Sequence, residues 1–293
     1  MVNDTSSEFI REFEKKAKSI TNDIDRSKKY RAGIAALAQK AVETNNTTFL
    51  DAAVGFTGKI IDDHDRSKAY VDIIRGTARV AINTADADLV GRSLGLSANT
   101  EEGHDRSHAL QGVVAAMADV GMKMDQPAFV EDSKELAGII EYDTYRSSAW
   151  RSIARTQHGN NDTPDAVNSA NKAMEIIDKS KLITREIYRA SAYVDLGKLF
   201  IDLGQEDMAR EYITKAVVSS MGLEDEFDRS SIFQAITETQ VRMGARTKDN
   251  ALLEDAVKSF NHITREYYRT STRQTLKSVL VNLKKDDLLK KLD

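Results

Sequence analysis

Residues 65–73 have the sequence DRSKAYVDI, and residues 25–33 repeat the pattern as DRSKKYRAG. The arginine of this motif returns seven times along the 293-residue chain, at intervals of 40 residues with one interval of 43. A period of this length is typical of stacked supersecondary units. The seven anchor arginines are Arg26, Arg66, Arg106, Arg146, Arg189, Arg229 and Arg269.

Positions counted from each anchor arginine predict a helix, named helix A, in every repeat. The residue four places later is aromatic or apolar in six of the seven copies, as at Tyr70, and the residue seven places later is apolar or glycine in all, as at Ile73. Offsets 2, 9 and 13 carry Lys68, Arg75 and Arg79 in the same repeat. Because these two sets fall on opposite faces of a helix, the pattern indicates an amphipathic helix.

A second helix, helix B, is predicted after a polar turn in each repeat. The residue 24 places after the anchor arginine is apolar in all six complete copies, and the residue 27 places after it is small. A small side chain at a fixed place allows close approach of a neighbouring helix, so we expect the same crossing in each unit. The small residues are Ala53, Ser93, Ser133, Ala173, Ala216 and Ala256.

These repeats predict an all-α fold: an α-α superhelix, or right-handed α-solenoid, of about seven helical hairpins and roughly 14 helices. Only two prolines and 15 glycines are present, too few for the turns of a β-sandwich or barrel. We expect one domain over residues 1–293, with an N-terminal half-repeat at 1–21, six complete repeats at 22–263 and a capping repeat at 264–293. The longer interval is expected to extend the junction near 178–182 without a domain boundary.

The composition excludes several classes of protein. With 42 Lys and Arg against 46 Asp and Glu, the net charge is -4, which disfavours a general nucleic-acid binder. The absence of cysteine excludes disulfides, thiolate metal sites and cysteine nucleophiles, and it fits a reducing compartment. No long apolar run and no signal-peptide pattern at residues 1–11 are present, so we expect a soluble, cytoplasmic protein without a membrane partner.

The fifth repeat resembles the tetratricopeptide repeat family. It combines an aromatic residue, a Leu-Gly pair, a second aromatic residue, a Gly turn and two alanines at that family's spacing, although the period of 40 exceeds the family's shorter unit. The matching residues are Tyr193, Leu196, Gly197, Phe200, Gly204, Ala209, Ile213 and Ala216.

This resemblance implies a protein-binding superhelix whose A helices line a concave groove, with no catalytic residues. The residues mapped to that groove are largely basic, which suggests an acidic peptide segment or a carboxylate terminus as ligand. They are Lys28, Arg31, Lys68, Arg75, Arg79, His108, Arg151, Arg155 and Lys198, with Gln234 and Arg242 further along the chain.

The anchor arginines have two possible roles. An acid recurs three residues before most of them, for example Asp63 before Arg66, and it can pair with the guanidinium near the positive end of the helix dipole. We favour a structural ladder in which each guanidinium bonds to carboxylates or backbone carbonyls. The alternative is a row of anion contacts.

Metal and enzyme sites are weaker hypotheses. The acidic run at residues 62–65 resembles a magnesium and diphosphate site, but acids recur at these helix starts in most repeats. His64, His104 and His108 could converge on zinc, yet apolar residues hold the equivalent slot elsewhere, which favours partly packed histidines. Without a phosphate loop, serine elbow or zinc-hydrolase motif, we expect no enzyme, no metal and no cofactor.

The sequence therefore predicts a non-enzymatic interaction scaffold that binds a protein or peptide segment. A nucleic-acid or polyanion binder is the alternative, although acids such as Asp72 and Asp119 interrupt the groove arginines. We expect a monomer or weak self-association.

Overall fold

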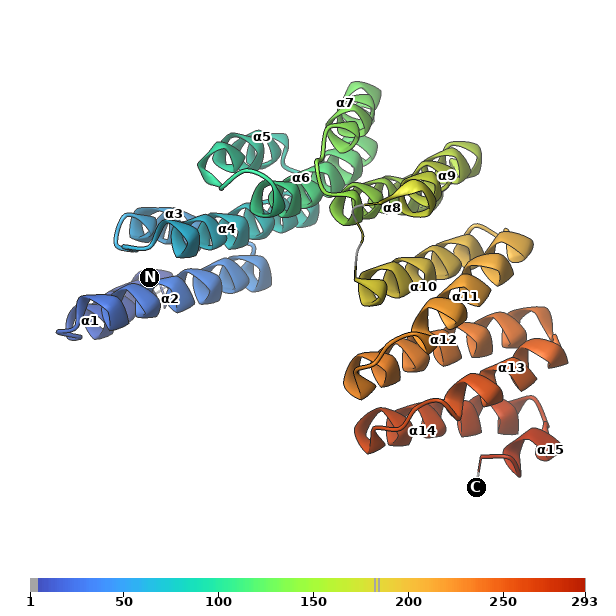
Figure 1. Ribbon diagram of the computed structural model, residues 1–293. Coiled ribbons are helices and arrows are strands. Elements are labelled where there is room, and N and C mark those ends of the chain that lie inside the picture. The colour runs from blue at the N-terminus through green and yellow to red at the C-terminus, as the bar shows by residue number, and fades with distance from the viewer. Residues whose placement is uncertain (1–4, 182, 184, 293) are drawn as a thin grey trace. The chain divides into compact units, whose positions relative to one another are not determined.

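The computed structural model describes residues 5–181, 183 and 185–292 (Figure 1). Over these residues it contains fifteen α-helices, one short 3-10 helix at Ser97–Asn99 and no strand. Helices of the A and B types alternate along the chain, which is the arrangement of a helical repeat protein. The all-α helical-repeat prediction is confirmed, and the expected number of helices was one too low.

The A helices are α2 (Asp23–Thr44), α4 (Asp63–Thr84), α6 (His104–Lys123), α8 (Asp143–Gly159), α10 (Glu186–Asp202), α12 (Glu226–Thr247) and α14 (Glu266–Asn282). The B helices are α1 (Thr5–Lys18), α3 (Thr48–Thr57), α5 (Ala87–Leu96), α7 (Pro127–Gly138), α9 (Thr163–Lys179), α11 (Glu206–Met221), α13 (Asn250–Phe260) and α15 (Asp286–Leu289).

Helix A begins three residues before its anchor arginine in six of the seven repeats. The side chains of Asn22, Asp62 and Asp225 cap α2, α4 and α12 by accepting a backbone N–H three residues later. In the third repeat Gly103, with a φ of 80°, replaces the recurring acid, and α6 begins one residue later. Local helix-start chemistry therefore sets these boundaries.

The buried face of the repeat is the one that the sequence predicts. The six apolar residues at offset 7, from Ile73 to Leu276, are 0% exposed, and so are all six small residues of the B helices. In the first repeat the offset is Gly33, and the Phe13 ring of α1 occupies the space that a Cβ there would need. The N-terminal half-repeat thus packs closely on α2.

Two recurring side chains contact the loops before the A helices. Every anchor arginine donates to the backbone carbonyl six residues before it, at 2.9–3.3 Å. In the first, second, third and sixth repeats the serine after the arginine accepts a backbone N–H from the loop of the next repeat, as Ser67 does from Glu101 at 2.9 Å. Ser27 and Ser230 make the equivalent bonds to Ile61 and Thr264.

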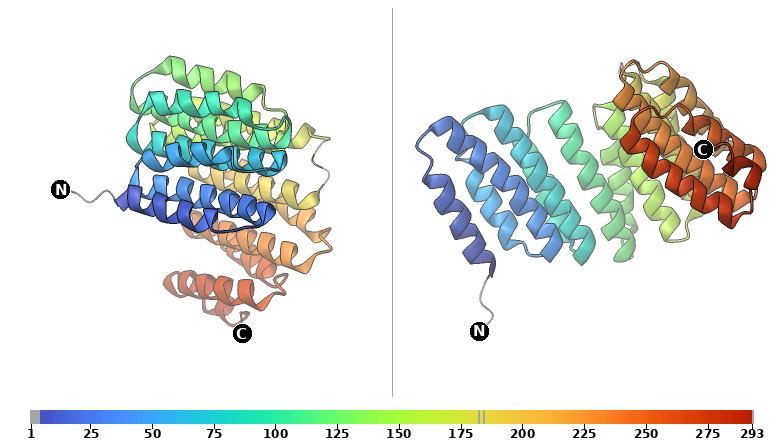
Figure 2. Two further views of the ribbon diagram at one scale, coloured as in Figure 1. Left: turned by 90° about the vertical axis from the view of Figure 1, so that its left-hand side faces the viewer. Right: turned by 90° about the horizontal axis from the view of Figure 1, so that it is seen from below.

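The chain divides into two compact units, Met1–Ala166 and Val167–Asp293. Within the first unit, α2, α4, α6 and α8 pack side by side as one layer, and α3, α5 and α7 each pack against the A helices before and after them. Within the second unit, α10, α12 and α14 form the corresponding layer. Figure 2 shows the same succession of helices within each unit.

The single domain over residues 1–293 stays a prediction. The division falls after Ala166, inside α9, and not in the predicted irregular junction. Of that junction, Leu182 lies outside the described residues. No helix of the described part combines the length and apolar character needed to cross a bilayer.

Candidate functional site

The A-helix layer of the first unit contains a cavity of about 820 Å³. Four consecutive A helices, α2, α4, α6 and α8, supply its walls, and no B helix contributes to the described lining. The lining residues are Ala35, Ala38, Gln39, Val42, Asp72, Arg75, Gly76, Ala78, Arg79, Ile82, Asn83, Gln111, Gly112, Ala115, Ser152 and Arg155.

Three of the sequence-predicted groove residues, Arg75, Arg79 and Arg155, meet at this cavity. All three are exposed, and none forms a hydrogen bond or ion pair with a residue that the structure describes. The arginines come from α4 and α8, which α6 separates in the layer. The packing of the repeats thus brings Arg155 close to Arg75 and Arg79, although these residues are distant in sequence. No carboxylate pairs with any of the three guanidinium groups in the part of the chain that the structure describes.

Asp72 is the only acid among the described lining residues, and it is already paired. Its carboxylate accepts a hydrogen bond from Arg31 at 2.6 Å, across the α2–α4 contact. Arg31 therefore neutralises Asp72 and is not a lining residue itself. Because this pair cancels, the cavity keeps the positive charge of three arginines.

The cavity floor is made of small residues. A Cβ on Gly76 would lie 3.1 Å from the Cβ of Ala38, and a Cβ on Gly112 would lie 3.3 Å from Cγ of Arg75. The Arg75 stem therefore crosses the backbone of α6 closely, which no larger residue at Gly112 would allow without a shift. This close packing holds the Arg75 side chain against the floor.

His108 lies beside the cavity and not in its lining. Its ring stacks on Tyr145 with centroids 4.8 Å apart and an interplanar angle of 19°. Burial, followed by the positive charge of Arg75, lowers the pKa of His108 to about 4. The imidazole is therefore uncharged at neutral pH and adds no positive charge to the site.

The other predicted groove residues occupy different environments. Arg151 is buried, with 7% of its surface exposed, whereas Lys28 and Lys68 are exposed on α2 and α4 and do not line the cavity. Three more residues belong to the second unit: Lys198 and Gln234, both half-buried, and Arg242, which pairs with Asp202 at 2.5 Å.

The sequence analysis missed the neutral polar residues of the lining, namely Gln39, Asn83, Gln111 and Ser152. Their repeat offsets would have suggested three of them. Gln39 has the same offset of 13 as Arg79, and Ser152 has the same offset of 6 as Asp72. Gln111 has the same offset of 5 as Arg31 and Gln234.

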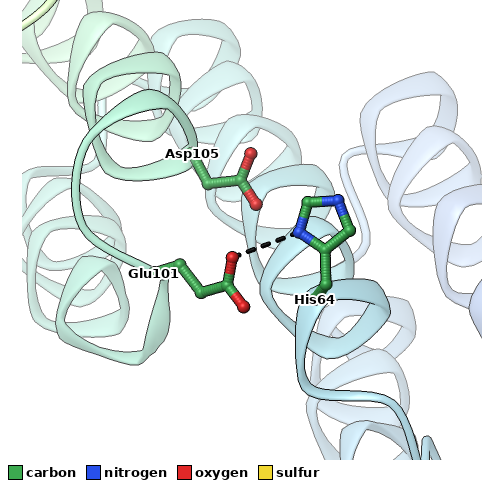
Figure 3. A group of neighbouring side chains, drawn as sticks. All are labelled: His64, Glu101 and Asp105. Carbon is green, nitrogen blue, oxygen red and sulfur yellow. Dashed lines mark hydrogen bonds and ion pairs between the residues drawn. The ribbon is translucent and has the colours of Figure 1, made fainter.

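A second cluster lies at the junction of the second and third repeats. His64 of α4 bonds through Nδ1 to Oε2 of Glu101 at 3.1 Å, and Asp105 of α6 lies beside them (Figure 3). His104 lies between this cluster and Tyr145: its Nδ1 is 3.3 Å from Oδ1 of Asp105, and its Nε2 is 2.8 Å from the Tyr145 hydroxyl. The three histidines considered for zinc do not converge, because the His108 ring stacks on Tyr145.

The magnesium hypothesis for residues 62–65 loses two of its three carboxylates to local roles. Asp62 caps α4 through Asp65 N at 2.8 Å, and Asp63 pairs with Arg66. The side chains of His64 and His104 are 57% and 60% exposed, so most of each imidazole is unpacked, and His64 faces acids. His104 does contact the Tyr145 ring, at 5.1 Å between centroids.

Comparisons with known proteins name no family. No family model matches the sequence, and no curated protein matches it. Among solved structures, the chain is similar to a Rap protein complexed with competence and sporulation factor, with 14% identity over 95% of this chain and 81% of that chain and a TM-score of 0.43.

Two further structures are similar at lower scores. Ton1535 from Thermococcus onnurineus NA1 shares 12% identity over 93% of this chain and 99% of that chain, with a TM-score of 0.28. A circular tandem repeat protein with novel repeat topology and enhanced subunit contact surfaces shares 12% identity over 98% and 74%, with a TM-score of 0.30. These scores are too low to transfer a function.

Proposed function

We propose that this chain is a non-enzymatic interaction scaffold that binds an acidic segment of a protein partner in the arginine-lined cavity of its first unit. The observation that carries this proposal is the set of three uncompensated guanidinium groups, Arg75, Arg79 and Arg155, on one helical layer. Guanidinium forks bind carboxylates through two parallel hydrogen bonds. Acidic side chains or a terminal carboxylate are therefore the matching ligand groups.

The remaining lining suits a polypeptide. Alanine and glycine on the floor leave room for a ligand backbone, and Ile82 and Val42 offer apolar contacts. The side-chain amides of Gln39 and Gln111 can donate to and accept from peptide groups of a bound segment. Orientation would come from the arginines and affinity from the burial of the segment's apolar residues.

The test is fluorescence anisotropy with a fluorescein-labelled peptide rich in glutamate and aspartate. The double variant Arg75→Ala/Arg79→Ala should bind this peptide about tenfold more weakly than the wild type, because two charge-assisted contacts are lost. Its binding should also depend less steeply on salt. An unchanged dissociation constant would remove the cavity from the proposal.

A matched control removes two positive charges elsewhere in the same unit. Lys15 of α1 and Lys59 after α3 are exposed and outside the cavity lining. The variant Lys15→Ala/Lys59→Ala should bind the peptide as the wild type does, so an equal loss in both variants would indicate a net-charge effect. Single-stranded RNA tests the alternative ligand class. If RNA binds more tightly than the peptide and needs the same arginines, the polyanion alternative replaces the protein segment.

A further inference from the structure

The cluster of His64, Glu101 and Asp105 brings together three metal-ligating side chains from two consecutive repeats. His64 lies in the first turn of α4, Glu101 in the loop before α6 and Asp105 in the first turn of α6 (Figure 3). One ligand atom from each, an imidazole nitrogen and two carboxylate oxygens, lies within 4.8 Å of the other two. It is the only such set of three in the described part of the chain.

The repeat does not produce this set at the next junction. There the equivalent places hold His104, Glu141 and Tyr145, and the Tyr145 hydroxyl bonds to His104 Nε2 at 2.8 Å. The Tyr145 hydroxyl thus stands where the second junction has the buried Asp105 carboxylate, and it contacts Nε2 of His104. The recurring geometry brings the three positions together, but only the junction of the second and third repeats fills them with one histidine and two acids.

Ser67 positions two of the three ligands. Its hydroxyl donates to Oδ2 of Asp105 at 2.7 Å and accepts the backbone N–H of Glu101 at 2.9 Å. Asp105 is 7% exposed, and its other oxygen, Oδ1, lies 3.3 Å from Nδ1 of His104, so burial and two polar contacts hold the carboxylate in place. An outer hydrogen bond that orients a ligating carboxylate is a common feature of metal sites.

We propose that His64, Glu101 and Asp105 bind a divalent first-row transition-metal ion, with water completing its coordination. The two carboxylates offset the charge of the ion, and a nitrogen with two oxygens suits zinc and its neighbours better than calcium. Two ligand atoms of a tetrahedral zinc ion are about 3.3 Å apart. The His64–Glu101 pair already lies at 3.1 Å, and only the wider pairs must approach.

The half-exposed side chains allow that approach. His64 is 57% exposed and Glu101 is 49% exposed, so both can rotate towards the fixed Asp105 without disturbing the core. A bound ion would then connect the first turn of α4 to the first turn of α6 and to the loop before α6. Because the complete site exists only in the folded chain, metal binding should raise the thermal midpoint as its concentration rises.

The experiment is isothermal titration of tag-free protein with zinc chloride. We expect about one ion per chain in the wild type, and at least tenfold weaker binding in each of the variants His64→Ala and Glu101→Gln. The matched control is Glu141→Gln, which makes the same change at the same offset one repeat later. It should bind zinc as the wild type does.

Three results would overturn the proposal. They are the absence of saturable zinc binding in the wild type, full binding by His64→Ala and Glu101→Gln, and an equal loss in the control Glu141→Gln. A readout that needs no variant is the visible spectrum of the protein titrated with cobalt(II): intensified d–d bands support protein ligands, and the spectrum of the aqueous ion contradicts them. These results are independent of peptide binding, since no ligand of the cluster lines the cavity.

Discussion

At the scale of the residue, each anchor arginine contacts the chain on its N-terminal side. The Arg66 guanidinium donates to the Ile60 carbonyl at 2.9 Å and also pairs with Asp63, whose side chain is 80% exposed. An exposed ion pair contributes little to stability, whereas a hydrogen bond from a charged donor to a buried loop carbonyl contributes more. We infer that the ladder acts mainly through the carbonyls.

Replacing the two partners separately tests this inference. Arg66→Ala should lower the free energy of unfolding by about 1 to 3 kcal/mol, because the Ile60 carbonyl loses its donor. Asp63→Ala should lower it by less than about 0.5 kcal/mol. Urea unfolding followed by circular dichroism measures both. A fully stable Arg66→Ala protein would favour anion contacts as the role of the row.

His108 gives a pH-dependent prediction at the same scale. The folded chain holds its pKa at about 4, below the usual 6.5, mainly through burial and then through Arg75. Between these two values the unfolded chain binds a proton that the folded chain does not. Stability should therefore fall as the pH falls from about 6.5 to about 4, by roughly 1 to 2 kcal/mol after allowance for solvent screening.

The variant His108→Gln isolates this contribution. It removes the titrating group, so its stability should decline less between neutral and acidic pH than that of the wild type. The comparison is urea unfolding of both proteins across this pH range. Parallel curves would show that the imidazole is free to protonate in the folded protein.

At the scale of the element, glycine marks where helices approach closely. A Cβ on Gly121 of α6 would lie 2.7 Å from the Cβ of Phe129 on α7, whereas a Cβ on Gly91 of α5 would meet nothing within 4 Å. Gly121→Ala should destabilise the protein by about 1 to 3 kcal/mol, because α7 must move. Thermal unfolding measures the change.

The same substitution at Gly91 is the control. Alanine there gains helix propensity and meets no neighbour, so Gly91→Ala should raise the free energy of unfolding by about 0.5 to 1 kcal/mol. Opposite signs for two glycine-to-alanine changes would support the helix packing described. A gain at both sites would contradict the α6–α7 contact.

Helix positions were predictable from the sequence because each repeat carries its own start signals and buried stripe. Contacts between repeats were harder to predict from the sequence. The serine of the motif was visible, but its bond to the next loop depends on how far one repeat rises above the last. The cluster of His64 with Glu101 and Asp105 was missed for the same reason, since its members are 37 and 41 residues apart.

At the scale of the whole molecule, an acidic chain carries a basic site. Residues 1–166 carry a net charge of -5 and residues 167–293 one of +1, yet Arg75, Arg79 and Arg155 share one cavity in the acidic first unit. The sequence predicted these three as groove residues because they lie on the polar face of helix A. It did not show that Arg151 is buried or that Asp72 is neutralised by Arg31, because both depend on packing between repeats.

The central claim is that an acidic segment occupies this cavity, and the absence of cysteine allows a direct test. A thiol introduced as Ser152→Cys lies in the cavity lining, and one introduced as Gly91→Cys lies on α5, outside it. The measurement is the rate of maleimide labelling of each thiol with and without the Glu- and Asp-rich peptide. We predict that the peptide slows labelling at position 152 and leaves position 91 unchanged. Equal rates at position 152 with and without saturating peptide would contradict the claim.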